Sequence, residues 1–553
     1  MAGGSWPSSR RPILAVRPAT NSLFVHRIFR KPDSTFRSDA LGHCGGAGGA
    51  YIEARRLLRR TRFDEAVSFT TLSDEARIAL DNMADFAFSL GSPSLRLGVT
   101  GLSRAGKTVF ITALIHNLTH GGRLPMFEPW RSGRLQGADI RPQLHPDVPT
   151  FDYRGHVRKL TDARVWPEST RQISELRLTI AYESATFLGR SLGRGKLDLD
   201  IVDYPGEWLL DLPLLSKDYR AFSRETLERA REPRRTAIAA DWLTHTSGVD
   251  PLGPADDEVA GRLHALFSTY LGAARGGSLS LSMVPPGRFL MPGDLAGSPA
   301  LTFAPLDLPD TGEAPRDSLW ALMESRFEAY KDVVVRPFFR THFARLDRQV
   351  VLVDVLAALN GGREALLDLE VALGEILACF RPGHSSWLGQ VLTRRIDRIL
   401  FAATKADHLH HVSHDRLELI LRRLTDRAIA RASFSGAEVD VKALAAVRAT
   451  REATVRRNGE SLPCILGVPQ EGELLDDHLY DGKEEIALFP GDLPENPQAL
   501  FREPEVGEPA FDALRFLRFR PPPVEVTAEG VSLSLPHIRL DRALDFLIGD
   551  RLA

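Results

Sequence analysis

The chain has 553 residues, of which 43% are hydrophobic and 26% are charged, and its formal net charge is −2 at pH 7. This length exceeds a single compact core and indicates several domains, while the small net charge gives no reason to expect nucleic acid as a partner. The three cysteines are far apart in sequence and no apolar run approaches eighteen residues. We therefore expect neither a disulfide framework nor a transmembrane segment, and a reducing compartment.

Residues 1–65 form a basic segment with few acids and the Gly-rich string GHCGGAGGA. Its composition is similar to that of an organelle transit peptide, but it holds too little apolar surface to fold. We expect a disordered extension here. Within its last part, residues 53–66 have the pattern of a basic amphipathic helix, and a second helix is expected from Ser73 onward.

The most informative stretch is GLSRAGKT, which matches G-x-x-x-x-G-K-[ST] at every fixed position. An apolar run precedes it and an apolar helical pattern follows it, so the order is strand, loop and helix. In such a P-loop the backbone N–H groups and the lysine contact phosphates, and the threonine hydroxyl binds Mg²⁺. The expected nucleotide-binding residues are Gly101, Ser103, Arg104, Ala105, Gly106, Lys107 and Thr108, with Lys107 also catalytic.

Two further elements follow the P-loop in the order that nucleotide switches use. WPEST precedes an alternating strand pattern at residues 176–180, and its Thr170, with Ser169 as second candidate, is expected to reach the magnesium ion and the γ-phosphate. A buried strand pattern then ends at Asp203 in D-x-x-G. We expect Asp203 to hold a magnesium-bound water and the N–H of Gly206 to reach the γ-phosphate.

Residues 216–345 contain helical patterns broken by loop-rich sequence and are predicted to be a helical insertion. Apolar strand patterns resume at residues 350–356 and 398–403, and a last one is PCILGV at 463–468. Within the insertion, the cluster Arg231, Arg234 and Arg235 is expected to face water. The predicted division is 1–65 extension, 66–206 first part of the P-loop domain, 207–345 insertion, 346–470 second part of the P-loop domain and 471–553 C-terminal extension.

The strand at 398–403 is followed by Thr404, Lys405, Ala406 and Asp407, a variant of N-K-x-D. One carboxylate can accept both the N1–H and the amine of guanine, whereas adenine presents an acceptor at N1. Asp407 is therefore expected to select guanine, with Thr404 and Lys405 beside it. The four histidines at 408, 410, 411 and 414 lack a standard zinc spacing, and we expect them to be polar surface.

Taken together, GLSRAGKT, WPEST, DYPGEWLLDLPLL, PPGRFLMPGDLAG, VLVDVLAALNGG and TKADHLHH resemble the YcjX-like family of bacterial P-loop proteins, which is related to Ras-like GTPases. The resemblance covers roughly residues 70–553. It implies an α/β P-loop fold with a Ras-like G domain, a mostly parallel sheet with helices on both faces. It also implies a cytoplasmic, stress-associated protein that binds and hydrolyses GTP with Mg²⁺ and is often encoded beside a membrane protein.

By analogy with switch GTPases, Thr108, Thr170 and Asp203 would form the magnesium shell, and Thr404, Lys405 and Asp407 would bind guanine. A short loop at Val447, Arg448 and Ala449 would also contact the base. Glu207 stands where small GTPases usually have the glutamine that orients the attacking water. A carboxylate can also accept a hydrogen bond from that water, so Glu207 is assigned this catalytic role.

Three functions remain open at this point. The favoured one is a GTPase whose residues 119–172 and 204–216 change conformation with the nucleotide. An ATPase on the same core is the second, and T-K-x-D argues against it. The third is a GTP-binding adaptor with negligible turnover, which the substitution of glutamine by Glu207 keeps open. The protein effector is not identified; a membrane protein is one candidate, with the protein peripheral at the inner membrane.

Overall fold

The computed structural model describes residues 93–553 except 103, 144, 186–194, 277–280, 344, 380–395, 435, 458–459, 476, 504–513, 515 and 525–533. The basic extension over 1–65 and the helices expected at 53–66 and from Ser73 lie outside the described residues. So does Ser103 of the predicted P-loop.

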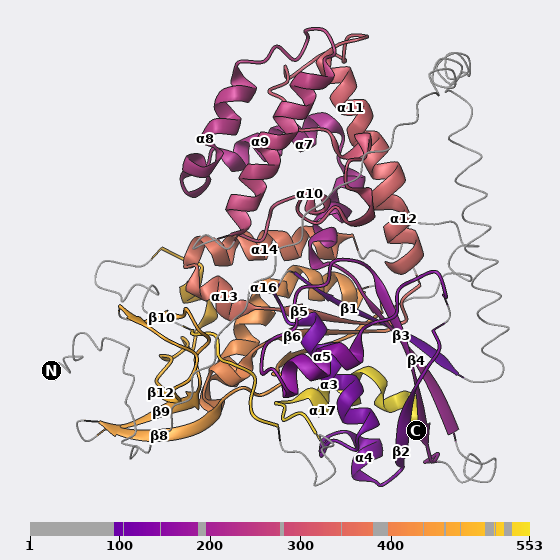
Figure 1. Cartoon of the computed structure of the whole chain (residues 1–553), viewed down its shortest axis with the longest axis vertical. Coiled ribbons are helices and arrows are strands. Elements are labelled where there is room, and N and C mark those ends of the chain that lie inside the picture. The colour runs from indigo at the N-terminus through magenta and orange to yellow at the C-terminus, as the bar shows by residue number, and fades with distance from the viewer. Residues whose placement is uncertain are drawn as a thin grey trace, which may run out of the picture. The chain divides into compact units, whose positions relative to one another are not determined.

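A seven-stranded sheet in the order β2-β3-β4-β1-β5-β6-β7 organises the fold (Figure 1). Strands β4, β1, β5, β6 and β7 run parallel, whereas β3 is antiparallel to both β4 and β2. Because parallel strands end at one edge, the residues that follow β1, β4 and β6 meet there. The strands are β1 Ser94–Gly101, β2 Leu135–Arg141, β3 Ser174–Tyr182, β4 Gly195–Asp203, β5 Arg348–Val353, β6 Arg398–Ala403 and β7 Glu438–Ala443.

Helices cover both faces of this sheet, which explains the continuous apolar runs within β5 and β6. Along β5 the side chains alternate, with Val350 and Leu352 in one core and Val351 and Val353 in the other. The first face is covered by α3 (Lys107–Thr119) and α17 (Leu540–Ile548), and the second by α14 (Arg363–Ala378) and α16 (His414–Phe434). The expected α/β P-loop fold is thus confirmed.

Between β4 and β5 the chain forms a series of helices, which we call the insertion (Figure 1). Its helices pack around a core rich in aromatic side chains, including Trp242, Phe267 and Phe327. Asp218, Asp256 and Ser318 cap three of the helices with side-chain hydrogen bonds. The helices are α7 Tyr219–Ala230, α8 Pro233–Ser247, α9 Asp257–Arg275, α10 Gly287–Leu290, α11 Leu319–Tyr330 and α12 Arg336–Phe338.

The segment after Asp203 forms a 3₁₀ helix, η1 (Gly206–Ser216), that joins the sheet to the insertion. Its apolar side chains, among them Trp208, Leu209 and Leu212, lie in the core of the insertion. The backbone N–H groups of Gly287 and Arg288 donate hydrogen bonds to the Asp211 carboxylate of η1 at 2.7 and 3.2 Å. The segment predicted to respond to the nucleotide is therefore built into the insertion.

The prediction that PCILGV is the last strand of the main sheet was wrong. This run lies in β9 (Glu460–Gly467), which pairs with β8 (Arg451–Arg457) and β12 (Ile486–Leu488) in a separate antiparallel sheet. A short apolar run shows that a strand is buried but does not show to which sheet it belongs. The seventh strand of the main sheet is instead β7, and the edge strand β2 lies within residues 119–172, where no strand was expected.

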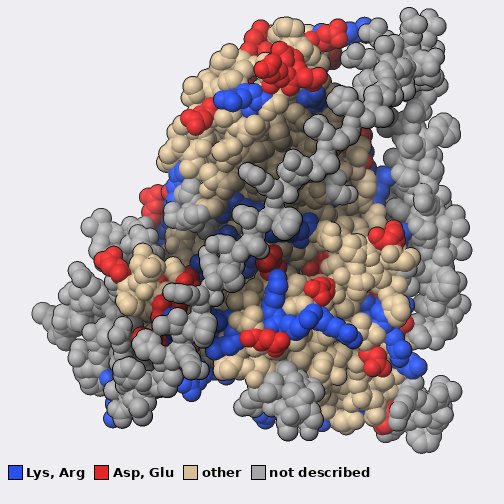
Figure 2. All heavy atoms as spheres, in the orientation of Figure 1, with Lys and Arg blue, Asp and Glu red and all other residues tan. Residues whose placement is uncertain are grey.

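Smaller elements complete the described chain. They are α4 Glu128–Arg131, α5 Tyr153–Thr161, α13 Val355–Asn360, β10 Leu474–Leu475 and β11 His478–Leu479. None of the helices in the described part of the chain is both long and apolar enough to cross a lipid bilayer. Both signs of charge are interspersed on the face shown in Figure 2, with Lys and Arg gathered across its lower middle.

Candidate functional site

The P-loop connects β1 to α3 and places Lys107 at the start of that helix. Gly106 has φ of 87°, a left-handed conformation that glycine adopts without strain, and it directly precedes the helix. The Nζ of Lys107 donates hydrogen bonds to the carbonyl oxygens of Gly101 (2.8 Å) and Leu102 (3.3 Å). Burial lowers the pKa of Lys107, while the nearby carboxylates of Glu207 and Asp203 favour its charged form. The lysine is thus held against the loop that it is expected to serve.

The three residues expected around the magnesium ion lie together. The hydroxyls of Thr108 and Thr170 are hydrogen-bonded at 3.2 Å, and Thr170 donates to Oδ2 of Asp203 at 2.7 Å. The other oxygen of Asp203, Oδ1, is buried and has no hydrogen-bond partner among the described residues. Burial raises the pKa of Asp203 to about 6, although the charge of Lys107 opposes that rise.

Gly206 approaches the P-loop so closely that no larger residue would fit. A Cβ at this position would lie 2.3 Å from the carbonyl oxygen of Gly101 and 2.5 Å from the Nζ of Lys107. The next residue, Glu207, is 2% exposed, and its carboxylate forms an ion pair with Arg275 of α9. The residue expected to orient water is therefore held by the insertion in this structure.

The second predicted motif begins where β6 ends. The N–H and hydroxyl of Thr404 donate to the carbonyl oxygen of Val353, at 3.0 and 3.4 Å. Lys405 has φ of 61° and forms an ion pair with Asp354 at the end of β5. The substitution of asparagine by Thr404 thus leaves the loop tied to β5.

Asp407 lies against the loop that was assigned to the base. It is 3% exposed, and its Oδ2 accepts a hydrogen bond from the backbone N–H of Ala449 at 2.8 Å. The hydroxyl of Thr450 donates to the carbonyl oxygen of Asp407. Of the expected loop, Val447 is buried and lines the same cavity as Asp407. The structure therefore brings Asp407 and residues 447–449 together.

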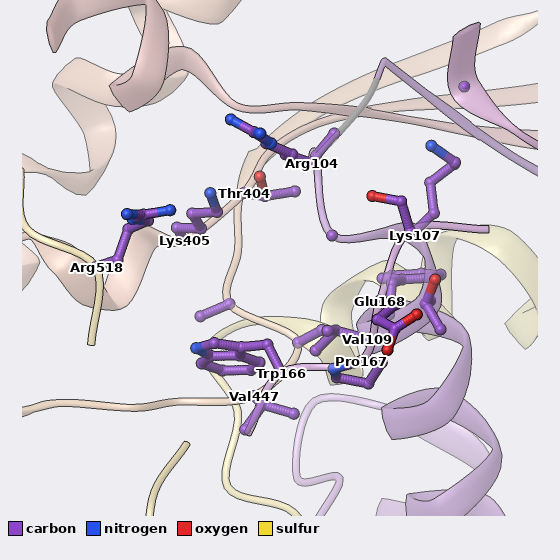
Figure 3. A pocket seen from close by; sticks show the side chains of 18 of the residues that line it. Arg104, Lys107, Val109, Trp166, Pro167, Glu168, Thr404, Lys405, Val447 and Arg518 are labelled. Carbon is purple, nitrogen blue, oxygen red and sulfur yellow. The ribbon is translucent and has the colours of Figure 1, made fainter. Parts of the chain in front are cut away.

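A cavity of about 290 Å³ runs from the P-loop to Asp407 (Figure 3). Its lining comes from the P-loop, the loop before β3, the segment after β4, the T-K-x-D motif and the loop after β7, together with residues nearer the C-terminus. Among the predicted residues, its lining includes Arg104, Ala105, Gly106, Lys107, Thr108, Thr170, Gly206, Glu207, Thr404, Lys405, Asp407 and Val447. Residues from five separate predicted segments thus share one cavity.

Comparison with known proteins identifies the family. A family model described as the YcjX-like family, DUF463, matches residues 95–552. The chain belongs to the YcjX-like family. It is 38% identical over 470 residues to a protein named Ras-like GTPase YcjX from Escherichia coli (strain K12). The aligned region covers 83% of this chain and 96% of that protein. A Ras-like GTPase YcjX from Shewanella oneidensis is 35% identical over 483 residues, 83% of this chain and 94% of that protein.

In this YcjX-like chain, the cavity is also lined by two aromatic residues. The motifs gave no indication of either residue. Trp166 lies beside Val447 (Figure 3), and its Nε1 donates to the carbonyl oxygen of Phe519 at 2.7 Å. Phe519, 1% exposed, comes from the C-terminal segment. The tryptophan stands in WPEST, four residues before Thr170, so a search for aromatic residues near that threonine could have found it. Nothing in the sequence marks Phe519.

Two expectations of exposed side chains in this YcjX-like chain were wrong in part. His408 and His414 are buried: the ring of His408 lies edge-on to Phe519 at 5.3 Å, and Nε2 of His414 is 2.9 Å from the carbonyl oxygen of Ala406. In the insertion Arg231 is exposed as expected, but Arg235 is 2% exposed and pairs with Asp368. The charges that were expected to face water include a buried structural pair.

Proposed function

We propose that this chain binds GTP and hydrolyses it to GDP and phosphate in the presence of Mg²⁺, as a nucleotide-dependent switch. The observation that carries this proposal is one cavity lined by Lys107, Thr170 and Asp407, with Asp203 hydrogen-bonded to Thr170. A phosphate-binding loop, a candidate cation shell and a candidate guanine reader are the parts that a GTPase needs. The names of the two relatives support the same function.

The phosphate end has the charges and donors that the role requires. Helix α3 begins at Lys107, residues 104–108 line the cavity, and Lys107 adds a positive charge there. The lysine is now bonded to the carbonyl oxygens of its own loop. In the proposed complex it exchanges these bonds for oxygens of the outer phosphates.

The geometry of the three residues expected around the magnesium ion is compatible with a bound cation. Thr108, Thr170 and Asp203 present oxygen atoms within a few ångströms, and Oδ1 of Asp203 is buried without a partner among the described residues. Oxygen donors of this kind suit Mg²⁺. When bound, the ion would neutralise charge on the triphosphate. The residues themselves would hold it and would order the segment around Thr170.

The base end supports guanine over adenine. Asp407 is fixed by the N–H of Ala449 through one oxygen, and a carboxylate can accept from both donors of guanine. Adenine would place an acceptor against this carboxylate. An ATPase is the alternative on the same core, and it requires that Asp407 does not face the base.

Turnover requires water to attack the γ-phosphorus while the bond to the β-phosphate oxygen breaks. We propose that Glu207 accepts a hydrogen bond from this water. In the structure its carboxylate is paired with Arg275, so the role requires that this pair opens. A GTP-binding adaptor with negligible turnover is the alternative in which it stays closed.

The experiment is equilibrium binding of labelled GTP and ATP, followed by single-turnover hydrolysis with and without Mg²⁺. We expect GTP to bind more tightly than ATP and Lys107→Ala to abolish triphosphate binding. Asp203→Ala should retain GDP and lose the magnesium-dependent turnover. Lys196→Ala, at an exposed lysine of β4, is the matched control and should behave as wild type. Tighter binding of ATP by the wild type would replace the GTPase with the ATPase.

From the family resemblance we also propose a cytoplasmic protein linked to the stress response, whose effector is another protein, either free or in the inner membrane. The division at residues 66–206, 207–345, 346–470 and 471–553 remains part of this proposal. Affinity capture with the GTP-bound and GDP-bound protein tests the effector. A partner that binds both states equally would contradict a switch.

A further inference from the structure

An arginine of the insertion reaches the residue expected to orient the attacking water. Arg275 is the last residue of α9, and its guanidinium forms an ion pair with the carboxylate of Glu207 in η1. The side chain of Glu207 is 3% exposed and that of Arg275 is 24% exposed. The two paired residues are 68 positions apart in sequence and lie in different elements.

The same arginine lies at the edge of the phosphate site. It lines a second cavity, of about 330 Å³, together with Arg104 and Ala105 of the P-loop and Lys405. Arg275, Arg104 and Lys405 thus bring three positive charges to one cavity. Positive charges that repel each other within one cavity are typical of a site that binds a polyanion.

Helix α9 holds Arg275 on a rigid support. The apolar side of the helix is buried in the insertion core through Leu263, Phe267, Leu271 and Ala274, and Asp256 caps its first turn. A guanidinium delivered from the end of such a helix needs only side-chain rotation to change partners.

The insertion also fixes the backbone of Glu207. A Cβ on Gly287 would lie 1.7 Å from the carbonyl oxygen of Glu207, so the two backbones are in direct contact. Beside this contact, the N–H of Gly287 donates to Asp211. Glu207 is thus clamped through its main chain, and its side chain is left to exchange partners.

We propose that Arg275 is an internal catalytic arginine, which leaves Glu207 when the triphosphate binds and then stabilises the negative charge that develops on the transferring phosphoryl group. This inference rests on the proposed GTPase function. One exchange of partners has two effects: the guanidinium moves to the phosphates, and the carboxylate of Glu207 becomes free to accept a hydrogen bond from water. The ion pair is the resting state of the same machinery.

Hydrolysis forms one bond at the γ-phosphorus and breaks another. The oxygen of water forms a bond to the γ-phosphorus, and the bond from that phosphorus to the bridging oxygen breaks, with its electron pair left on GDP. The proton of the water passes to Glu207 and then to the released phosphate. Arg275 stays protonated throughout and contributes charge only; an arginine supplied within the chain or by a partner is worth about 10³–10⁵-fold in turnover.

The test compares wild type, Arg275→Ala and Arg275→Lys in GTP binding and single-turnover hydrolysis. We expect Arg275→Ala to lower the hydrolysis rate by at least about 100-fold and to change GTP and GDP affinity by less than about threefold. Arg275→Lys keeps a positive charge next to Glu207 but lacks the planar fork, and its rate should also fall. Arg231→Ala, which removes an exposed arginine of the insertion, is the matched control and should keep the wild-type rate.

Two further readouts separate a catalytic from a positioning role. GDP with aluminium fluoride mimics the transition state, and we expect wild type to form this complex and Arg275→Ala to fail to form it. Millimolar guanidinium ion should restore part of the lost rate to Arg275→Ala, which a residue that only positions Glu207 would not allow. Melting temperatures of all variants confirm that the folded protein is compared.

An unchanged or faster rate in Arg275→Ala would overturn this inference, because the ion pair would then be a lock on Glu207 or a plain structural contact. If the alanine variant does not fold, an unchanged rate in Arg275→Lys together with unchanged fluoroaluminate binding overturns it. A wild type that binds GTP without turnover would instead overturn the proposed hydrolysis itself. The two failures are therefore distinguishable.

Discussion

The hydroxyl of Thr170 donates a hydrogen bond to Oδ2 of Asp203 at 2.7 Å. Thr170 lies in the loop between α5 and β3, whereas Asp203 ends β4, so this bond joins the two segments that were assigned to the magnesium shell from chain order alone. Ser169, the other candidate, is exposed in this structure. The geometry therefore favours Thr170 as the residue that responds to the cation.

Replacing Thr170 tests that choice. Thr170→Val keeps the shape and removes the hydroxyl that bonds to both Thr108 and Asp203. We expect the Mg²⁺ concentration for half-maximal GTP binding to rise at least about tenfold, a cost of about 1.4 kcal/mol, since a direct ligand is lost. Ser169→Ala is the control and should leave the titration unchanged. A stronger effect in the serine variant would reverse the assignment.

Asp407→Asn should change the preferred base from guanine to xanthine. The oxygen of asparagine can still accept from the N–H of Ala449 or of the base, while its NH₂ donates to the carbonyl that xanthine has in place of the guanine amine. We expect the ratio of GTP to XTP affinity to shift by at least about tenfold, or about 1.4 kcal/mol. Competition of GTP, XTP and ATP against a labelled analogue measures it, with the exposed Asp415→Asn as control. If the variant still ranks GTP first, Asp407 does not read the base.

Gly206→Ala should weaken triphosphate binding at least about tenfold. Its Cβ would meet the backbone carbonyl of Gly101 at 2.3 Å, and a backbone atom cannot move aside as a flexible side chain would. The P-loop or η1 must therefore shift away from its position beside Lys107. The measurement is GTP affinity, with the melting temperature as a check on folding.

Gly261→Ala gives the matched comparison. Gly261 lies within α9, and a Cβ there meets nothing within 4 Å. We expect unchanged nucleotide affinity and a gain in the free energy of unfolding of roughly 0.5–1 kcal/mol, because alanine favours the helix over glycine. A similar loss of affinity in both variants would show that the contact at Gly206 is not the cause.

The buried His342 should make the protein less stable in mild acid. Burial lowers its pKa to about 4, against an ordinary value of 6.5, so the unfolded chain binds this proton and the folded chain does not. The free energy of unfolding should therefore fall as pH falls from about 6.5 to 4, by up to roughly 3 kcal/mol from this group. Urea unfolding at several pH values should give a shallower dependence in His342→Gln than in wild type. Parallel curves, or the same change in the exposed His478→Gln, would contradict this prediction.

Features with local causes could be predicted from the sequence. The P-loop was predictable because a glycine motif stands between an apolar strand and an apolar helix, and β5 because the apolar run at 350–353 is typical of a strand covered on both faces. The edge strand β2 could not be found in this way. Its side chains are largely exposed or half-exposed, so LQGADIR carries no apolar pattern.

Contacts between distant segments were beyond the sequence. The motif D-Y-P-G-E places Glu207 after Gly206 but gives no sign that Arg275 lies against it, since the pairing depends on how α9 packs in the insertion. Trp166 was within a quoted motif, yet its place in the cavity depends on Phe519, which is 353 residues away. Such residues carry no motif because their role is set by tertiary packing.

Helix α17 covers the same face of the sheet as α3, with Leu544, Leu547 and Ile548 buried beside Leu114. Because α3 ends at Thr119 and α17 begins at Leu540, about 420 residues are translated between them. At typical elongation rates of about 5–20 residues per second, this takes roughly 20–80 s. Throughout that time the growing polypeptide on the ribosome lacks the helix that covers this part of the apolar face in the folded protein. Newly made molecules should therefore depend on chaperones until translation is nearly finished.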